Sequence, residues 1–241
     1  MIFDIRPGDP ASPVILHVPH ASRELTAEAR ASILLSDDEL AEELDNLTDA
    51  HTAEIAARVP GVWEFRNRWS RLVVDPERFP DEREEMLAVG MGAVYTHGFA
   101  GRRLRSSDPD RDRKFIDEHF RPYARGVADL VGERLAATGR AVVVDVHSYP
   151  AVALPYELHG DGPRPPICVG TDDFHTPAAL LTAANTTFPE MSLNSPFAGC
   201  YVPLEYYGRE KAVEAVMIEI RRDCDPRVVS EQLTAFVAAI S

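Results

Sequence analysis

The chain has 241 residues, of which 45% are hydrophobic and 27% are charged, an ordinary composition for a globular protein that buries a core. Its formal net charge of -14 argues against nucleic acid as a partner, because a protein that neutralises phosphates needs a basic surface. A small anionic substrate is still compatible with this charge, since a few arginines can dominate the field inside a cavity.

The predicted elements alternate between strands and helices along the chain. A short apolar run over residues 14–18 predicts a buried strand, and a helix follows from the cap at Ser36 through Arg58. Residues 71–75 form a second apolar run and predict another strand. Residues 114–137 then have the periodicity of a long amphipathic helix.

The second half of the chain continues the same alternation. Apolar runs at 141–146 and 215–220 predict two further buried strands, with a helix from 176 to about 187 between them. The proline- and glycine-rich stretch 149–166 follows a strand directly, so we interpret it as an active-site loop. The expected fold is therefore α/β, a mainly parallel or mixed sheet sandwiched by helices, with right-handed crossovers.

Polar residues that apolar burial does not explain accompany three of these strands. His20 follows the first strand, His147 ends the third, and Glu219 lies inside the last. Side chains brought to one edge of a sheet would form a metal site with a general base. Each has a plainer interpretation: the histidines as hydrogen-bonded loop residues, and Glu219 as the partner of Arg221 or Arg222.

A catalytic zinc needs a third protein ligand and one open position. Asp49, on the helix expected to pack near the first strand, is our choice, while Asp45 and His51 remain competitors. Asp145 could orient a ligand imidazole from the second coordination shell or simply accept a turn hydrogen bond at the strand end. The metal is expected to be Zn²⁺, although another divalent ion is possible because mixed histidine and carboxylate sites accept several.

Arginines cluster around the second predicted strand. Arg66 and Arg68 are as well explained as solvated surface residues, but Arg71 and Arg78 bracket the apolar run. Arginine is suited to binding a carboxylate with two hydrogen bonds or to stabilising an oxyanion. Arg71 and Arg78 are therefore the better candidates for substrate contacts.

The other histidines carry no ligand pattern. His17, inside the first predicted strand, is interpreted as a packed core residue. The rest are interpreted as surface or loop residues, apart from the competing role of His51: His51, His97, His119, His159 and His175.

Cysteine usage and hydropathy point to a compartment. The three cysteines are widely spaced and form no CxxC pair, so neither a disulfide framework nor a cysteine zinc site is expected. The first residues lack the pattern of a signal peptide, and no apolar run approaches the ~20 residues that span a bilayer. We therefore expect a cytoplasmic protein without a membrane or nucleic-acid partner.

Taken together, seven segments in order along nearly the whole chain resemble the N-formylglutamate amidohydrolase family. They are Val18-Pro19-His20-Ala21-Ser22, Thr48-Asp49-Ala50-His51-Thr52, Ser70-Arg71-Leu72-Val73-Val74-Asp75-Pro76-Glu77-Arg78, Phe120-Arg121-Pro122-Tyr123, Asp145-Val146-His147-Ser148, Asn194-Ser195-Pro196-Phe197-Ala198-Gly199 and Ile218-Glu219-Ile220-Arg221-Arg222.

The resemblance implies one catalytic domain over residues 1–241 with the zinc-carboxypeptidase-like (phosphorylase/hydrolase-like) fold. It implies zinc-dependent cleavage of the amide bond of an N-acyl amino acid, N-formylglutamate foremost, with an anionic small molecule as the substrate. The metal falls on His20, Asp49 and His147, and the general base on Glu219. Substrate or oxyanion contacts are implied for three arginines: Arg71, Arg78 and Arg222.

The chain departs from the family pattern at two places near the implied substrate. Ala21-Ser22 stands where Ser-Gly is usual after the first histidine, and the acidic stretch 75–78 replaces a more common Asn-Arg ending. Neither change removes an implied ligand, so amide hydrolysis follows more directly than formylglutamate itself. The alternatives are a related carboxypeptidase or deacylase and a non-catalytic metal-binding protein of the same fold.

Overall fold

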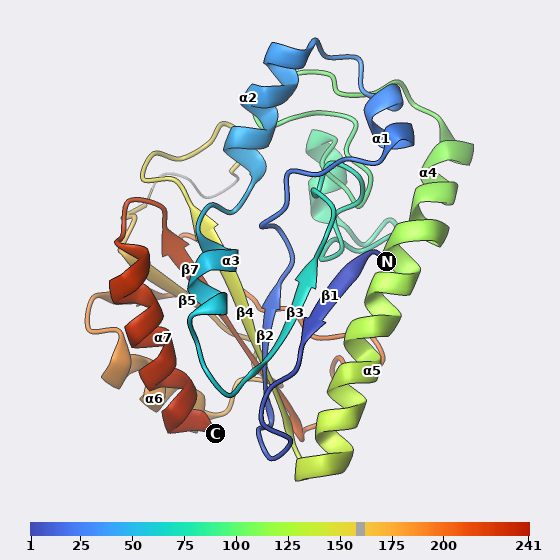
Figure 1. The fold of residues 1–241 in the computed structure, drawn as a ribbon. Helices are drawn as coiled ribbons and strands as arrows, with labels where there is room; N and C mark the ends of the chain where they lie inside the picture. The colour runs from blue at the N-terminus through green and yellow to red at the C-terminus, as the bar shows by residue number, and fades with distance from the viewer. Residues whose placement is uncertain (158–161) are drawn as a thin grey trace.

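A mixed seven-stranded sheet runs through the centre of the molecule (Figure 1). It is seen in a computed structural model that describes residues 1–157 and 162–241. In spatial order the strands are β1 (Phe3–Arg6), β3 (Trp63–Asn67), β2 (Val14–Val18), β4 (Ala141–Tyr149), β7 (Val213–Arg221), β5 (Ile167–Gly170) and β6 (Met191–Leu193). The four central strands β3, β2, β4 and β7 are mutually parallel, whereas β1 pairs antiparallel with β3, and β5 pairs antiparallel with β7 but parallel with β6.

Helices cover both faces of this sheet, and a third group lies above its carboxyl edge (Figure 1). One face carries α3 (Thr52–Ala57), α6 (Ala178–Thr187) and α7 (Pro226–Ile240). The other face carries α5 (Arg121–Thr138), which continues from α4 (Pro109–Phe115) through the π-helical turn η2 (Ile116–Phe120). Above the carboxyl edge lie α1 (Ala27–Ser32), α2 (Asp37–Leu47) and the 3₁₀ helix η1 (Glu85–Val89).

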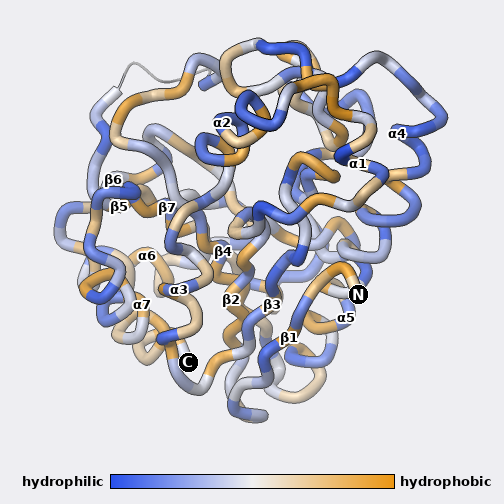
Figure 2. The backbone as a smooth tube through the Cα atoms, turned by 45° about the horizontal axis from the view of Figure 1, so that its top comes forward, coloured by the Kyte–Doolittle hydropathy of each residue, from blue (hydrophilic) through white to orange (hydrophobic). Residues whose placement is uncertain are grey.

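Alternation of side chains along the central strands builds two separate cores. In β4, Val142 and Val144 pack with α3, α6 and α7, while Val143 packs with α5. Because successive residues of a strand point to opposite faces, a strand buried on both sides needs a continuous apolar run. Figure 2 shows this as hydrophobic stretches along β2 and β4 at the centre, with hydrophilic turns outside.

The apolar runs therefore predicted the central strands well. The strands expected at 14–18, 141–146 and 215–220 are present, and the expected helices at 114–137 and 176–187 coincide with α4–η2–α5 and α6. The predicted class, an α/β fold with a mixed sheet between helices, is confirmed. Part of the loop expected at 149–166, namely residues 158–161 with His159, lies outside the described residues.

The strand predicted at 71–75 is wrong. These residues form turns, and β3 occupies the place beside β2. Leu72, Val73 and Val74 are all buried, but each belongs to a different hydrophobic cluster. A run that packs in three directions looks like a buried strand in sequence without forming one.

The helix predicted from the Ser36 cap through Arg58 is interrupted. Its start is correct, because Ser36 and Glu39 form a capping box at the beginning of α2. The chain leaves the helix at Thr48, and His51 adopts a left-handed conformation with φ of 69° before α3 begins. Asp49 therefore lies in a link between two helices, not on a helix.

Glu43, on α2, offers a test of the packing above the sheet. Its carboxylate is fully buried, accepts a hydrogen bond from Phe99 N–H at 3.0 Å, and leaves Oε1 without a partner among the described residues. Burial raises the pKa of Glu43, so folding favours its protonated form, and stability falls as pH rises above the ordinary glutamate pKa.

We expect Glu43→Gln to remove the free-energy cost of burying an ionised carboxylate at this position. Its free energy of unfolding should exceed that of the wild type by about 1 kcal/mol at pH 8, with a smaller difference at pH 4. Urea unfolding at both pH values measures this, and an equal difference at the two would contradict it.

Among the described residues, no helix combines the length and apolar character needed to cross a membrane.

Candidate metal centre and its cavity

Three side chains meet above the carboxyl edge of the sheet. His20 follows β2, and His147 lies near the end of β4. Asp49 reaches them because its backbone N–H donates to the His20 carbonyl at 3.0 Å, which ties the α2–α3 link to the end of β2. The helix break at His51 is thus what brings Asp49 to the strand ends.

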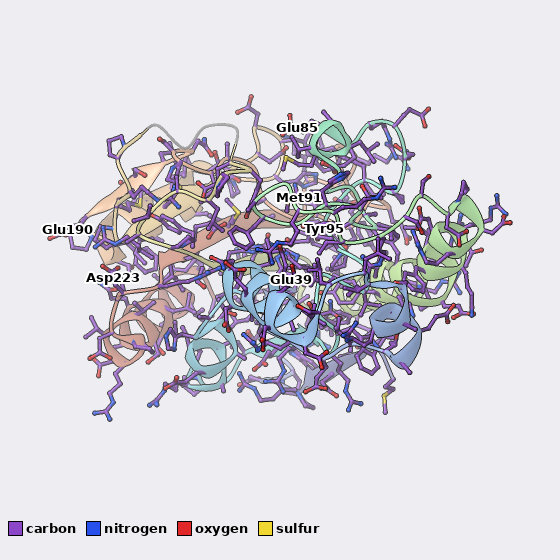
Figure 3. All side chains as sticks on the ribbon, turned by 90° about the horizontal axis from the view of Figure 1, so that it is seen from above. Glu39, Glu85, Met91, Tyr95, Glu190 and Asp223 are labelled. Atoms are coloured by element: carbon purple, nitrogen blue, oxygen red, sulfur yellow. The ribbon has the colours of Figure 1, made fainter. Side chains whose placement is uncertain are left out.

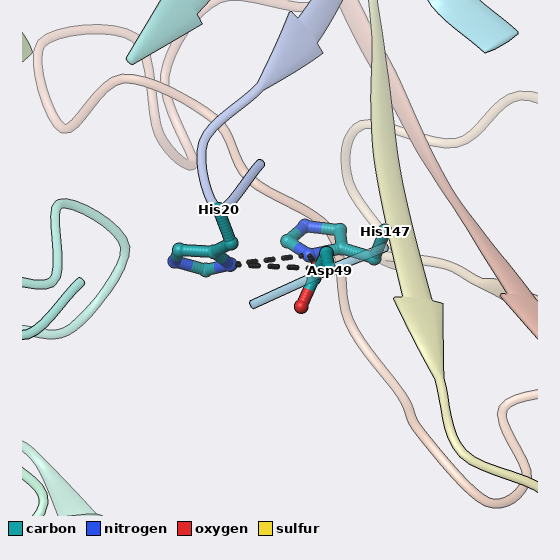
Figure 4. A group of neighbouring side chains, drawn as sticks. All are labelled: His20, Asp49 and His147. Carbon is teal, nitrogen blue, oxygen red and sulfur yellow. Dashed lines mark hydrogen bonds and ion pairs between the residues drawn. The ribbon is translucent and has the colours of Figure 1, made fainter. Parts of the chain in front are cut away.

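The three side chains converge on one point (Figure 4). His20 Nδ1 lies 3.3 Å from His147 Nδ1, Asp49 Oδ2 lies 2.9 Å from His147 Nδ1, and 3.7 Å separate Asp49 Oδ2 from His20 Nδ1. Ligands at about 2.0–2.1 Å from a tetrahedral zinc are about 3.3 Å from one another. The spacing of these three atoms therefore suits a cation between them.

Each imidazole also has a carboxylate beside its second nitrogen. His20 Nε2 donates to Asp75 Oδ1 at 2.9 Å, and His147 Nε2 lies 3.0 Å from Asp145 Oδ1. Carboxylates in this position fix the ring orientation of metal-binding histidines and raise their basicity. Asp145 thus lies where an orienting partner of His147 is expected, and Asp75 is a second such partner that the sequence did not single out.

Asp145 is held in turn by a buried network. His17, its neighbour in register across β2 and β4, lies 2.9 Å from it through Nδ1. The other ring nitrogen of His17 lies 2.6 Å from the Tyr123 hydroxyl on α5. The prediction that His17 is buried is confirmed, although its contacts are polar as well as apolar.

Two further groups among the described residues have spacing compatible with a cation, namely His17–Glu77–Asp145 and His20–Asp75–Glu77. Both reuse residues that flank the first group. In the first, His17 Nδ1 and Asp145 already pair with each other. In the second, Asp75 already pairs with His20 Nε2 and with Arg71. The group His20, Asp49 and His147 fits best.

The electrostatics of this group favour a cation. Burial lowers the pKa of His147, but the carboxylates of Asp145 and Glu77 outweigh it and hold that pKa well above its ordinary value. Although burial alone would raise the pKa of Asp49, hydrogen bonding to His147 and His20 lowers it strongly. Without a metal ion, protonation of the histidines balances the negative charge of these carboxylates, and a bound cation could balance it instead.

Glu219 lies next to His147 in the sheet, since the two residues are register partners across β4 and β7. The alternative pairing with Arg221 or Arg222 is not formed, because Arg221 binds Asp223 and Arg222 contacts Asp49. Glu219 instead lines a cavity, and its Oε2 has no hydrogen-bond partner among the described residues. Burial raises the pKa of Glu219 to about 8, so it holds a proton more firmly than an exposed carboxylate does.

Arg71, Arg78 and Arg222 all line this cavity. Each has a buried Nε with no hydrogen-bond partner in the described part of the chain. Buried donors are normally satisfied, so the protein itself pairs these three guanidinium groups incompletely.

Asp75 organises the two arginines that come from its own segment. Arg71 Nε lies 3.4 Å and Arg78 Nε lies 3.7 Å from Asp75 Oδ2, and the Tyr95 hydroxyl donates to the same oxygen at 2.6 Å. In the view from above, Tyr95 lies toward the middle of the molecule near α2, whereas Glu190 lies at the periphery (Figure 3).

The fully buried Arg105 stabilises the backbone of the segment that carries Arg71, Asp75 and Arg78. Its guanidinium donates to the carbonyls of Leu72 and Tyr95 and to the Ser32 hydroxyl. Burial lowers the pKa of Arg105 to about 10. The sequence gave no signal for this role, because Arg105 acts through backbone atoms of distant segments.

The cavity has a volume of about 470 Å³. Pro150, Tyr156 and Glu157 from the predicted active-site loop line it, as does the segment Pro196–Tyr201. The loop 149–166 was thus rightly placed beside the site, as far as it is described.

The competing ligands do not reach the site. Asp45 is exposed and pairs with Arg23, while His51 is exposed and lies 3.8 Å from Glu54. His175 lies in a loop, as predicted, but not at the surface: it is buried, lies 2.7 Å from the Val213 carbonyl through Nδ1, and accepts from Gly208 N–H.

Comparison of the sequence with protein-family models shows which family the chain belongs to. The family model for N-formylglutamate amidohydrolase matches residues 12–224. The chain belongs to the N-formylglutamate amidohydrolase family. The predicted resemblance to this family of amidohydrolases is confirmed.

Solved structures agree on the fold. An N-formylglutamate amidohydrolase from Ralstonia eutropha JMP134 superposes with a TM-score of 0.82 at 18% identity, over 99% of this chain and 96% of that one. A gene product from Agrobacterium tumefaciens superposes with a TM-score of 0.75 at 20% identity, over 99% and 94%. Comparison with curated protein sequences gave no match.

Proposed function

We propose that this amidohydrolase uses zinc, or a similar divalent ion, to cleave the amide bond of an N-acyl amino acid. N-formylglutamate, which would give glutamate and formate, is the first substrate to test. The observation that carries the proposal is the convergence of His20, Asp49 and His147 beside Glu219 in a cavity with unfilled arginine donors. We also propose that residues 1–241 act as one catalytic domain on a small anionic molecule.

The proposed ligands are His20 Nδ1, His147 Nδ1 and the Asp49 carboxylate. A divalent ion bound there would supply Lewis acidity. It would polarise a carbonyl group and lower the pKa of water, so that the water could lose a proton and act as a nucleophile near neutral pH. Asp75 pairs with His20 Nε2 and Asp145 lies 3.0 Å from His147 Nε2, so each carboxylate lies beside the ring nitrogen that is not a proposed ligand.

Glu219 is the proposed general base. Its buried carboxylate faces the cavity next to His147, so it can accept a proton from the attacking water and return it to the leaving amine.

The three arginines are proposed to bind anionic groups. Arg71, whose Nη2 lies 2.8 Å from His20 Nε2, is nearest to the metal ligands and is the candidate for the developing oxyanion. Arg78 and Arg222 lie further out and are candidates for the substrate carboxylate.

The test is a substrate panel on the zinc-loaded protein. N-formyl and N-acetyl derivatives of several amino acids, together with short peptides, are followed by release of the free amine. Hydrolysis of acyl amino acids that stops with a chelator and returns with zinc supports the proposal. Peptide cleavage instead would indicate a carboxypeptidase, and bound zinc without any hydrolysis would indicate a non-catalytic relative.

Arg78→Met should raise KM for the best acyl amino acid about 10- to 150-fold, because a charge-assisted hydrogen bond contributes about 1.5–3 kcal/mol. It should change kcat little if Arg78 acts equally on the ground and transition states. Initial-rate kinetics measure both constants. Arg83→Met, an exposed arginine of the next turn that pairs with Asp81, is the matched control. An unchanged KM in Arg78→Met would remove Arg78 from substrate binding.

A further inference from the structure

Tyr123 is a buried residue of α5 whose hydroxyl the proposed mechanism does not use. Its side chain is 1% exposed and packs edge-on against Phe65 of β3, with the ring centroids 5.1 Å apart. Both residues belong to an apolar cluster between α5 and the sheet. A phenylalanine would fill the same space, so packing alone gives no reason for a hydroxyl group here, and a buried phenol needs a hydrogen-bond partner.

That partner is His17 on β2. The Tyr123 hydroxyl oxygen lies 2.6 Å from His17 Nε2, and the other ring nitrogen, Nδ1, lies 2.9 Å from Asp145 Oδ1. Glu77 Oε1 is further from Nδ1, at 3.4 Å. His17 is fully buried, and the ring of Tyr201 stacks on it with the centroids 4.5 Å apart. Protein groups therefore hold the imidazole of His17 on both edges and on one face.

The direction of these hydrogen bonds follows from the chemistry of the three groups. The carboxylate of Asp145, in its ordinary ionised form, can only accept, so Nδ1 of His17 carries the proton between them. In the neutral ring, Nε2 is then an acceptor, and the Tyr123 hydroxyl donates to it. The phenol thus favours one of the two tautomers of His17, the one that donates to Asp145.

Asp145 connects this pair to the candidate metal centre. The oxygen that faces His17, Oδ1, also lies 3.0 Å from His147 Nε2, while Oδ2 accepts a hydrogen bond from the Tyr201 backbone N–H at 3.2 Å. The carboxylate is therefore held from both sides, and the contact with His17 acts on the oxygen beside His147. Neither Tyr123 nor His17 lines the cavity, so both can influence the centre only through Asp145.

We propose that Tyr123 and His17 are positioning residues of the metal centre. The Tyr123 hydroxyl fixes the tautomer of His17, His17 orients the carboxylate of Asp145, and Asp145 orients the imidazole of His147. This inference rests on the proposed function, because it takes His147 as a metal ligand. It places part of the support of the centre on α5, beneath one face of the sheet, in a residue that reaches neither the ligand atoms nor the substrate.

The tautomer of His17 is testable in the wild type without any substitution. Long-range proton–nitrogen correlation NMR of the zinc-loaded protein with isotopically labelled histidine shows which ring nitrogens carry a proton. His17 should be protonated at Nδ1 only, whereas His20 and His147, bound through Nδ1, should be protonated at Nε2. A His17 ring protonated at Nε2 or at both nitrogens would overturn the role of the Tyr123 hydroxyl.

Tyr123→Phe removes one oxygen atom and keeps the ring. Its zinc affinity, measured by competitive titration against a chelator, should be about three- to tenfold lower than that of the wild type. A direct partner of a metal-binding histidine contributes about 10- to 100-fold, and Tyr123 acts two contacts further out. His17→Leu interrupts the network, so in that background Tyr123→Phe should change zinc affinity by less than about twofold.

Tyr206→Phe is the matched control, because the Tyr206 hydroxyl donates to the Ala128 carbonyl of α5 at 3.4 Å and its ring packs against the same apolar cluster. It should bind zinc as the wild type does. A purely structural Tyr123 hydroxyl would lower the Tm of the metal-free protein and leave zinc affinity unchanged, which would overturn the proposal, as would an undiminished effect in the His17→Leu background. Wild-type zinc affinity in both Asp49→Asn and His147→Ala would overturn the ligand set of the proposed function instead. If Tyr123→Phe does not fold, the tautomer of His17 in the wild type decides.

Discussion

Glu219→Gln is expected to lower kcat about 1,000-fold while zinc content stays at the wild-type level. Glutamine keeps the size of the side chain but cannot accept the proton from water, and general base catalysis contributes about 100- to 10,000-fold. Because Glu219 lies outside the group His20, Asp49 and His147, the metal should remain bound. Steady-state kinetics combined with metal analysis on the same sample measure both quantities.

A matched variant on the same strand separates catalysis from packing. Glu214 lies near the other end of β7, where it pairs with Arg140 at 3.2 Å. Glu214→Gln should keep kcat within a few-fold of the wild type. Retained turnover in Glu219→Gln would show that another group accepts the proton and would end its assignment as the base.

Asp49→Asn should lose zinc and hydrolysis together. The amide removes the charge that the ion needs, and loss of even an outer partner of a metal ligand lowers affinity about 10- to 100-fold, so a lost ligand should cost more. His147→Ala should behave in the same way. Competitive titration against a zinc chelator measures the affinity, and the missing zinc-dependent rise in Tm checks it.

The residues that compete with Asp49 in the sequence provide the controls. Asp45→Asn makes the same chemical change four residues earlier, at an exposed ion pair with Arg23. His51→Ala removes an exposed imidazole. Both should bind zinc as the wild type does. Zinc binding that survives in Asp49→Asn but fails in either control would overturn the proposed ligand set.

The central strands were predictable because they are buried on both faces. A strand covered on both faces needs apolar side chains at nearly every position. The runs at 14–18, 141–146 and 215–220 meet this requirement with one polar residue each. His20 and His147, which follow two of these runs, and Glu219, which interrupts the third, stood out against them. Parallel strands present their carboxyl ends at one edge, so the sequence could also predict that these side chains meet.

Strands β1 and β3 escaped prediction because they lie at one side of the sheet. Phe65 is buried in β3, but Trp63 and Arg66 are only partly buried, so no continuous apolar run marks the strand. The segment 71–75 has such a run, but it serves three clusters above the sheet. A run of apolar residues in the sequence indicates that their side chains are buried. Only tertiary packing decides whether those residues form a strand or a loop.

The sequence by itself determined the α/β class, the family, and the two histidines and the glutamate at the strand ends, because strand periodicity and motif order are local properties. Only the tertiary structure decided that Asp49, and neither Asp45 nor His51, reaches the histidines, since this depends on a helix break and a hydrogen bond to His20. It alone also placed Asp75 and Glu77 against the imidazoles. Those contacts join segments more than 50 residues apart in the chain, and no local pattern encodes which distant side chains share one cavity.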